Sequence, residues 1–347
     1  MRYSLNCLLI RPVNTLTVAI VPLSGFTLSP RYRDAGLFVL LAALFGGSFA
    51  AIKTGLRELP PVLFAGLRFD VAAVVLLGYV VLTRGRGSWL PTNRRDLLAI
   101  STGAILLVAL NNGLLFLGQV STTPAAASVM YGLNPILAPV FAWWLLGNRL
   151  SVLGVAGIGV ALCGVVIIVQ PSPATLADPS SVGQLLVLGA AGAVALGSVL
   201  LRRIEPTLES VVVTAWSMAF GAVILHLGSL VVGEVQPNLF ALDTVTLLSI
   251  ASLGIPSTAV AYAIYFGLIE RIGPVRTNLV AYFVPVFAAL SGWLVLESAV
   301  SPWTGVGFLV VVAGFSLIER QVVVSEVLRL WERLRGNPPV AENVSDD

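Results

Sequence analysis

The sequence predicts an all-α polytopic membrane protein with ten transmembrane helices arranged as two inverted five-helix repeats. Apolar residues fill 57% of the 347 positions and charged residues only 11%, which leaves too little polar surface for a water-facing globule of this size. The apolar residues form ten runs of about 20 residues, the length that crosses roughly 30 Å of hydrocarbon. A long stretch of the first half also recurs in the second half, so the chain consists of two related parts.

The repeated stretch runs from Pro124 to Ser151, and its second copy begins 150 positions later at Pro274. The copies read PAAASVMYGLNPILAPVFAWWLLGNRLS and PVRTNLVAYFVPVFAALSGWLVLESAVS. A repeat of this length predicts two structural halves. The same offset aligns Pro135 with Pro285, Ala138 with Ala288, Trp143 with Trp293, Gly157 with Gly307 and Gly164 with Gly314.

The ten apolar runs are continuous and are separated by short loops. A membrane-spanning barrel strand needs only about ten residues of alternating polarity, so these runs predict helices. The expected spans are residues 35–56, 61–83, 96–119, 124–146, 151–170, 182–203, 208–232, 244–269, 274–297 and 301–319.

These spans divide the chain into five parts. Residues 1–33 form an N-terminal extension that we expect to be poorly ordered, because prolines interrupt its apolar run; a signal peptide is the alternative. Residues 34–170 and 182–320 are the two repeats, and residues 171–181 link them. Residues 321–347 comprise a cytoplasmic amphipathic segment and a disordered acidic tail. That segment either lies in the membrane interface or extends the last helix.

Loop charges predict the orientation of the chain. With a cytoplasmic N-terminus, fifteen arginines fall in cytoplasmic segments, and only Lys53 and Arg57 fall outside. Cytoplasmic loops are enriched in Lys and Arg, so the net charge of +3 reflects topology rather than nucleic-acid binding. We expect a multi-pass protein of the plasma membrane with both termini in the cytoplasm. Five crossings per repeat then invert the second copy, a layout in which one half rocks against the other around a midplane site.

Four segments carry a recognisable pattern. They are LFVLLAALFGGSFAAIK in the first span, FAGLRFDVAAVVLL in the second, and the pair LNPILAPVFAWWLLGNRLS and YFVPVFAALSGWLVLESAVS in the fourth and ninth. Together, over residues 33–320, they resemble the EamA-type transporters of the drug/metabolite transporter superfamily. The resemblance implies a secondary carrier for small metabolites or drugs, usually an exporter, with a central cavity between the halves. That family usually ends the fourth and ninth spans with Gly-Glu, whereas here Gly147 precedes Asn148 and Glu297 has no glycine before it.

Arg68 and Asp70, in the second span, are the clearest ionisable residues inside the expected membrane. Two positions on a helix are about 200° apart, so the two side chains face opposite ways and each needs a partner on another helix, or water. The resemblance suggests a structural ion pair or a gating role for Arg68, and Asp70 is a candidate for proton coupling. The lone histidine, His226, is expected to pack or to form a hydrogen bond, and Lys53 to reach the interface or guard the outer mouth.

Neutral polar side chains in the repeat-related spans are candidates for lining the substrate cavity, because a polar group in a lipid-embedded bundle needs an internal partner or water. They are Asn111, Asn112, Tyr131, Asn134, Tyr262, Tyr265, Asn278 and Tyr282. Alternatively, several of them bond neighbouring helices or lie at the membrane interface. Prolines inside spans remove helix hydrogen bonds and are candidate breaks or hinges: Pro135, Pro139, Pro256 and Pro285.

The sequence contains little that other chemistry could use. One histidine, two cysteines in unrelated contexts and no HExxH motif predict no metal, no cofactor and no enzyme. A single buried arginine also disfavours phosphate-bearing substrates. We therefore expect a secondary active transporter, an exporter of small amino-acid-like or amphiphilic solutes by alternating access, with protons as the candidate coupling ion. The first alternative is a non-transport sensor or structural module, and the second, less favoured one is a membrane-embedded enzyme.

Overall fold

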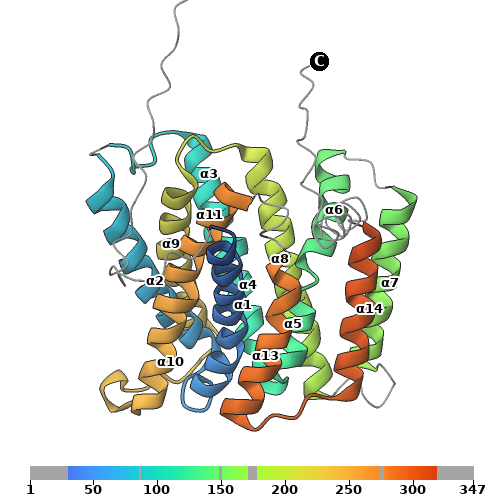
Figure 1. Ribbon diagram of the computed structural model, residues 1–347. Coiled ribbons are helices and arrows are strands. Elements are labelled where there is room, and N and C mark those ends of the chain that lie inside the picture. The colour runs from blue at the N-terminus through green and yellow to red at the C-terminus, as the bar shows by residue number, and fades with distance from the viewer. Residues whose placement is uncertain are drawn as a thin grey trace, which may run out of the picture.

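The structure, a computed structural model, describes residues 30–85, 87–147, 151–170, 178–272, 277 and 279–318. These residues form a bundle of helices that run roughly side by side, with no strand among them (Figure 1). Eight of the described helical stretches are long and apolar enough to cross a membrane, and α13 and α14 are shorter apolar helices. The N-terminal extension, most of the linker and the C-terminal amphipathic segment lie outside the described residues. The predicted all-helical class is confirmed.

In seven expected spans the structure describes one main helix each. They are α1 (Pro30–Gly55), α2 (Pro61–Thr83), α7 (Val152–Val169), α8 (Pro179–Ile204), α9 (Ser210–Val231), α13 (Val280–Leu296) and α14 (Pro302–Ile318). Three further spans are composite. The third joins α3 (Arg94–Thr102), a π-helix η1 (Gly103–Leu110) and α4 (Asn111–Ser121). The fourth contains α5 (Pro124–Tyr131) and α6 (Asn134–Leu146), and the eighth joins α10 (Thr244–Gly254), a π-helix η3 (Ile255–Val260) and α11 (Ala261–Ile272).

The two π-helices occupy equivalent places in the repeat, because η1 ends at Leu110 and η3 ends at Val260, 150 positions later. At each π-helix, a side chain donates a hydrogen bond to a backbone carbonyl oxygen that would accept from a backbone N–H in a regular helix. Asn111 Nδ2 donates to Leu107 O at 3.0 Å, and Thr258 Oγ1 donates to Leu253 O at 2.7 Å. Side chains of this kind compete with backbone donors and loosen a helix, and π-turns concentrate at functional sites.

Helix ends follow local sequence signals. Thr123, Ser151, Asp178 and Asp243 precede α5, α7, α8 and α10, and each side chain accepts a hydrogen bond from a backbone N–H of the first turn. Gly147 ends α6 with a left-handed φ of 69°, which costs glycine little. A short 3₁₀ turn, η2 (Leu239–Ala241), lies ahead of α10.

The two repeats interleave rather than form two lobes. The first helix of the chain, α1, packs against α13, α10 and α11 of the second repeat, as Figure 1 shows for the blue helix among orange ones. Conversely α8, the first helix of the second repeat, packs against α4, η1, α5 and α6 of the first. Two further contacts join equivalent helices of the repeats: α2 with α9, and α7 with α14. Packing therefore depends on helices exchanged between the halves.

Glycines bring α7 and α14 into backbone contact. A Cβ on Gly164 would lie 2.8 Å from the Gly307 carbonyl oxygen, and one on Gly314 would lie 2.6 Å from that of Gly157. Gly157 and Gly307 are equivalent positions of the two repeats, as are Gly164 and Gly314. The contact of Gly164 with Gly307 therefore has its repeat-related counterpart in the contact of Gly314 with Gly157. Such reciprocity is the mark of an interface built around a two-fold axis.

Carboxylates join α2 to α9 at both of their ends. Glu234, just after α9, accepts hydrogen bonds from the N–H groups of Val62 and Leu63 at 2.9 and 2.8 Å and so caps the start of α2. At the other end, the Arg84 guanidinium lies 2.6 Å from the Glu209 carboxylate. Negative charge at a helix N-terminus is favourable because it meets unpaired N–H groups and the positive end of the helix dipole.

Asp96 forms the densest buried polar network among the described residues. Its side chain is 1% exposed and accepts from the Thr207 N–H at 2.7 Å, the Thr207 hydroxyl at 2.8 Å and the Leu208 N–H at 3.1 Å. The Asn93 amide donates to it at 2.6 Å. A carboxylate at the start of α3 thus fixes the loop that leads into α9.

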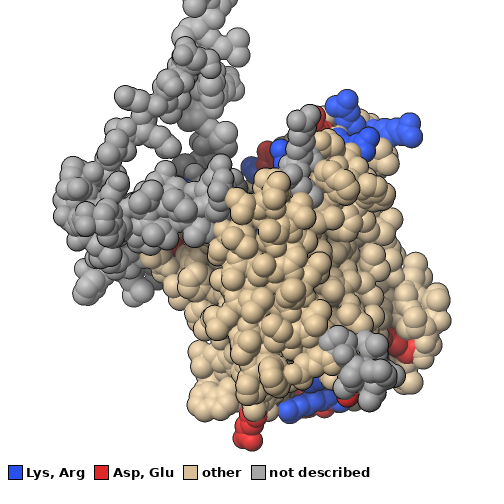
Figure 2. Space-filling view, turned by 90° about the vertical axis from the view of Figure 1, so that its right-hand side faces the viewer, with Lys and Arg blue, Asp and Glu red and all other residues tan. Residues whose placement is uncertain are grey.

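One face of the bundle carries a broad band of uncharged residues. On the face drawn in Figure 2, the charged side chains gather at the two ends and leave a tan surface between them. Large apolar residues are also exposed on several helices, for example Val74 on α2, Trp144 on α6 and Leu227 on α9. An apolar belt of this kind fits hydrocarbon rather than water, and the chain is a multi-pass membrane protein.

Candidate functional site

Arg68 connects the two π-interrupted helices of the bundle. It projects from α2, and its Nε and Nη2 donate to Thr258 Oγ1 in η3 at 3.3 and 3.2 Å. Its Nη1 donates to Asn112 Oδ1, two residues after η1 ends, at 3.4 Å. One guanidinium therefore contacts equivalent regions of both repeats.

The partners of Arg68 are neutral. No carboxylate in the described part of the chain pairs with its guanidinium, and the ionisable groups within electrostatic reach are the phenols of Tyr131 and Tyr262. Its three hydrogen bonds, at 3.2 to 3.4 Å, are longer than the roughly 2.7–2.9 Å of a charged donor bound to a carboxylate. A cation away from bulk water is costly unless it is paired, and beside these hydrogen bonds the Arg68 guanidinium carbon lies 5.2 Å from the centroid of the Phe69 ring, a cation–π contact.

Asp70 faces the other way, as its spacing from Arg68 predicts. Its Oδ2 lies 2.7 Å from Nε2 of His226 on α9. The side chains of Asp70 and His226 are 47% and 34% exposed, so the pair lies at the margin of the α2–α9 contact. Gly66 admits the imidazole, because a Cβ there would lie 3.0 Å from its Cε1. His226 is thus a hydrogen-bonding residue, and its partner is Asp70, the acidic residue that the sequence analysis identified as a candidate for proton coupling.

Three polar residues predicted in the third and fourth spans lie near Arg68. Asn112 binds it, and Asn111 is 5% exposed with an Oδ1 that has no hydrogen-bond partner among the described residues. The Tyr131 side chain lies within hydrogen-bonding reach of the Asn111 side chain and packs edge-on against Phe49, with ring centroids 6.1 Å apart. Asn134 is used locally, because its Nδ2 donates to the Tyr131 carbonyl at 3.2 Å in the turn between α5 and α6.

The predicted residues of the second repeat separate into two groups. Tyr262 lies beside Arg68 and packs edge-on against Phe45, with centroids 6.4 Å apart. Tyr265 packs instead with the apolar cluster around Leu41, and the Tyr282 ring lies 4.2 Å from that of Phe315 on α14. Asn278 is outside the described residues.

The four predicted helix breaks differ in form. Pro135 lies in the first turn of α6, directly after the turn that interrupts the fourth span. Pro256 is the second residue of η3, where its missing N–H removes a regular helix hydrogen bond. Pro139 and Pro285 lie inside α6 and α13, and both helices continue through them.

Sequence reasoning missed Thr258, the residue that Arg68 contacts through two hydrogen bonds. Its position could have been noticed, because Thr258 places a hydroxyl two residues after Pro256 within an apolar span. Lys53, expected at the interface or the outer mouth, caps the C-terminal end of α4, because its Nζ donates to the Gln119 and Val120 carbonyls at 2.8 and 2.7 Å. No cluster of three His, Cys, Asp or Glu suited to a metal occurs within the described ranges.

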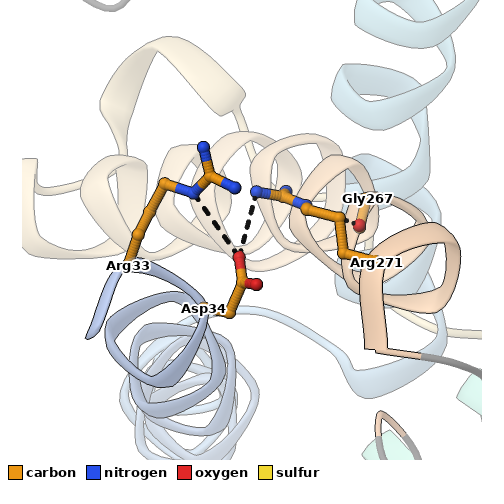
Figure 3. Close-up of polar contacts among 4 residues, drawn as sticks. All are labelled: Arg33, Asp34, Gly267 and Arg271. Atoms are coloured by element: carbon orange, nitrogen blue, oxygen red, sulfur yellow. Dashed lines mark hydrogen bonds and ion pairs between the residues drawn. The ribbon is translucent and has the colours of Figure 1, made fainter. Parts of the chain in front are cut away.

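One end of the bundle carries a charged contact between α1 and α11. Figure 3 shows Asp34 between two guanidinium groups, 3.5 Å from Arg33 Nε and 3.3 Å from Arg271 Nη1. Arg271 also donates from Nε to the Gly267 carbonyl at 2.8 Å, which fixes the direction of its side chain. These groups are partly exposed, so the contact orients the helix ends more than it stabilises them.

A sequence model described as the EamA-like transporter family matches residues 35–170 and, separately, residues 181–320. The chain is 24% identical over 277 residues to "Uncharacterized transporter YoaV" of Bacillus subtilis, which covers 80% of this chain and 93% of that protein. It is 29% identical over 259 residues to "Uncharacterized inner membrane transporter YedA" of Escherichia coli, which covers 74% and 81%.

Two further matches extend the comparison. A "Probable amino-acid metabolite efflux pump" of Escherichia coli is 25% identical over 295 residues and covers 81% of this chain and 93% of that protein. A crystal structure superposes with a TM-score of 0.57 at 21% identity, covering 83% of this chain and 97% of that chain. At this identity the crystal structure supports the fold alone.

Proposed function

The chain belongs to the EamA-like transporter family, and on that premise we propose that it is a secondary active transporter that exports small amino-acid-like or amphiphilic solutes by alternating access. The observation that carries the proposal is Arg68, which contacts Asn112 and Thr258 beside the two equivalent π-helices. The relative whose printed name mentions amino-acid metabolites supports the solute class.

The ten-helix inverted repeat is part of this proposal. The reciprocal contact of α7 with α14 and the equivalent positions of η1 and η3 support it. Because α1 and α8 are exchanged between the repeats, we propose that the moving units are mixed bundles rather than sequence halves. One unit contains α1 with α10, α11 and α13, and the other contains α8 with α4, α5 and α6. The loosened turns of η1 and η3 then allow these units to bend around Arg68.

Transport is tested with purified protein in liposomes. Vesicles preloaded with amino acids and related amphiphilic metabolites should take up the labelled solute by counterflow, and protein-free vesicles should not. Replacing Arg68 by glutamine should abolish the uptake, whereas Arg84→Gln, the same change at the far end of α2, should leave it intact. Absence of counterflow for every solute of the panel would refute the transport proposal.

For the orientation, we propose that both termini lie in the cytoplasm. Arginines lie on the inner side in this arrangement, including Arg84 directly after α2 and Arg94 and Arg95 in the first turn of α3. A single cysteine placed at Ser88 in a cysteine-free background should then resist a membrane-impermeant thiol reagent added to intact cells. Labelling from outside would reverse the topology.

Proton coupling is proposed for the Asp70–His226 pair. The two side chains are each other's only ionisable partner among the described contacts, and they join α2 of one repeat to α9 of the other. Taking up a proton on this pair changes its charge and therefore the cost of keeping it at a lipid-facing margin. Asp70→Asn and His226→Gln should both flatten the pH dependence of transport, while uptake down a solute gradient persists. If either variant keeps the wild-type pH profile, that residue does not carry the proton.

A further inference from the structure

We propose that Lys53 and Gln119 form a latch at the end of the bundle where α1 and α4 finish, which we call the Lys53 end. Lys53 holds this end closed, and the buried amide of Gln119 favours its opening. In the proposed orientation the Lys53 end faces outward, so the latch sets how often the interior is exposed to the outside. This inference rests on the proposed alternating access, since it names the contacts that one of the two states must break.

The two proposed units meet at the Lys53 end. There α5 packs against α1 and α13, which belong to the other unit (Figure 1). A Cβ on Gly292 of α13 would lie 3.3 Å from the Cβ and Cγ atoms of Pro124, the first residue of α5. Toward the opposite end, α6 packs mainly against α8, and α11 against α1 and η3, so each helix stays within its own unit. The units are therefore joined more closely at the Lys53 end.

Lys53 links two helix pairs that are each in backbone contact. A Cβ on Gly46 of α1 would lie 2.7 Å from the carbonyl oxygen of Val284 on α13. A Cβ on Gly118 of α4 would lie 2.5 Å from the carbonyl oxygen of Gly183 on α8. Close backbone approach of this kind holds two helices together, so α1 moves with α13 and α4 moves with α8. The hydrogen bonds of Lys53 Nζ run from the first pair to the second.

The Lys53 contact joins a cation to the end of a helix. Its two acceptors, the carbonyls of Gln119 and Val120, belong to the last turn of α4. Such carbonyls lack a partner within the helix and lie at the negative end of its dipole, so a cation there is favourable. No carboxylate in the described ranges pairs with Lys53. By contrast, the Ser121 hydroxyl donates to the Pro179 carbonyl at 2.6 Å, from α4 to α8, and this bond stays inside one unit.

The Gln119 side chain opposes the closed state. It is 0% exposed, and neither its amide oxygen nor its amide nitrogen has a hydrogen-bond partner among the described residues. Thr122, directly after α4, also buries a hydroxyl that has no partner in the described part of the chain. Burying polar atoms without partners raises the free energy of the closed state, because water satisfied them before burial.

Gln119 lies on the face of α4 that water would reach if the units parted. It follows Asn112 by seven residues and Phe116 by three, so the three side chains share one face of the helix. Asn112 and Phe116 both contact α2 across the interior. Opening of the Lys53 end would hydrate the Gln119 amide along this face and would break the bonds of Lys53. The two effects are of similar size and opposite sign, which keeps both states accessible.

The test measures opening through the reactivity of a buried cysteine. Ser128→Cys, in the full-length chain without its native cysteines, places a thiol on α5 at a position that is 1% exposed. Position 128 lies one turn after Pro124, which meets α13. A charged, membrane-impermeant methanethiosulfonate is added to intact cells, and its reaction rate follows the fraction of open molecules. Phe240→Cys, fully exposed in η2, reports access of the reagent and the orientation.

Variants of the latch should change this rate in opposite directions. Lys53→Met should raise it about tenfold, because the hydrogen bonds of a charged donor are lost. Gln119→Met keeps the length of the side chain and removes the unpartnered amide, so it should lower the rate about tenfold and raise Tm. Lys53→Arg should stay within about threefold of wild type, since a guanidinium also donates to carbonyls. Ser121→Ala is the matched control and should leave the rate unchanged.

Two results would overturn the inference. An unchanged rate in Lys53→Met, even with a lower Tm, would reduce Lys53 to a structural cap of α4. An unchanged rate in Gln119→Met, even with a higher Tm, would make the buried amide a packing defect with no part in opening. If Phe240→Cys reacts only in inside-out vesicles, the orientation is reversed and the same rates are compared in those vesicles.

The proposed function fails separately, because labelling requires no solute. Absence of counterflow in the wild type would remove transport, while opposite rate changes in Lys53→Met and Gln119→Met would keep the latch. Counterflow in the wild type with unchanged labelling in both variants would keep the transporter and remove the latch.

Discussion

Replacing Gly314 by alanine is expected to destabilise the chain by about 1–3 kcal/mol, as overpacking of a close contact does. The new Cβ would lie 2.6 Å from both the backbone nitrogen of Ala161 and the carbonyl oxygen of Gly157. Backbone atoms cannot rotate away as a side chain does, so α7 and α14 must separate. Gly164→Ala should act in the same direction, since its Cβ meets the Gly307 carbonyl at 2.8 Å. Thermal unfolding of the detergent-solubilised protein measures both effects.

Gly305 provides the matched control on the same helix. A Cβ there meets nothing within 4 Å, so Gly305→Ala should be neutral or stabilising by up to about 1 kcal/mol through helix propensity. Opposite signs at Gly314 and Gly305 would show that the loss comes from the helix contact and not from replacing glycine as such. Equal Tm values for the two variants would contradict the close contact of α7 with α14.

Asp96→Ala is expected to be the most destabilising change at the charged end of α3, at about 3 kcal/mol or more. Each hydrogen bond to a charged acceptor contributes about 1.5–3 kcal/mol, and the substitution leaves the N–H groups of Thr207 and Leu208 without their present acceptor. Thermal unfolding and size-exclusion chromatography in detergent report the loss.

Asp178→Asn is the control for Asp96→Ala. Asp178 is also an aspartate at the start of a helix, but it is exposed and accepts one hydrogen bond, from the Ser180 N–H at 3.1 Å. Asparagine caps a helix about as well, so the Tm should stay within about one degree. A similar small change in Asp96→Ala would contradict the buried network.

The sequence predicted the helical class because apolar runs of membrane length have no other stable form, and it placed Arg68 and Asp70 on opposite faces because helix geometry alone decides that. The π-helices could not be predicted, because they depend on whether each backbone N–H bonds the carbonyl five residues earlier or the one four residues earlier. The contacts of Arg68 with Thr258 and of Asp70 with His226 join residues 190 and 156 positions apart. They follow from the packing of helices rather than from local spacing. The exchange of α1 and α8 between the repeats escaped prediction for the same reason.

That exchange has a consequence for biosynthesis. When the ribosome has made the first repeat, α1 has entered the membrane, but α10, α11 and α13, against which it packs, have not yet been made. The α4–α6 region likewise waits for α8. Neither half can complete its interior alone, so an early chain must keep unburied helix faces in lipid until the last spans arrive. Folding therefore finishes late, and a chain cut between the repeats should assemble only when both fragments share one membrane.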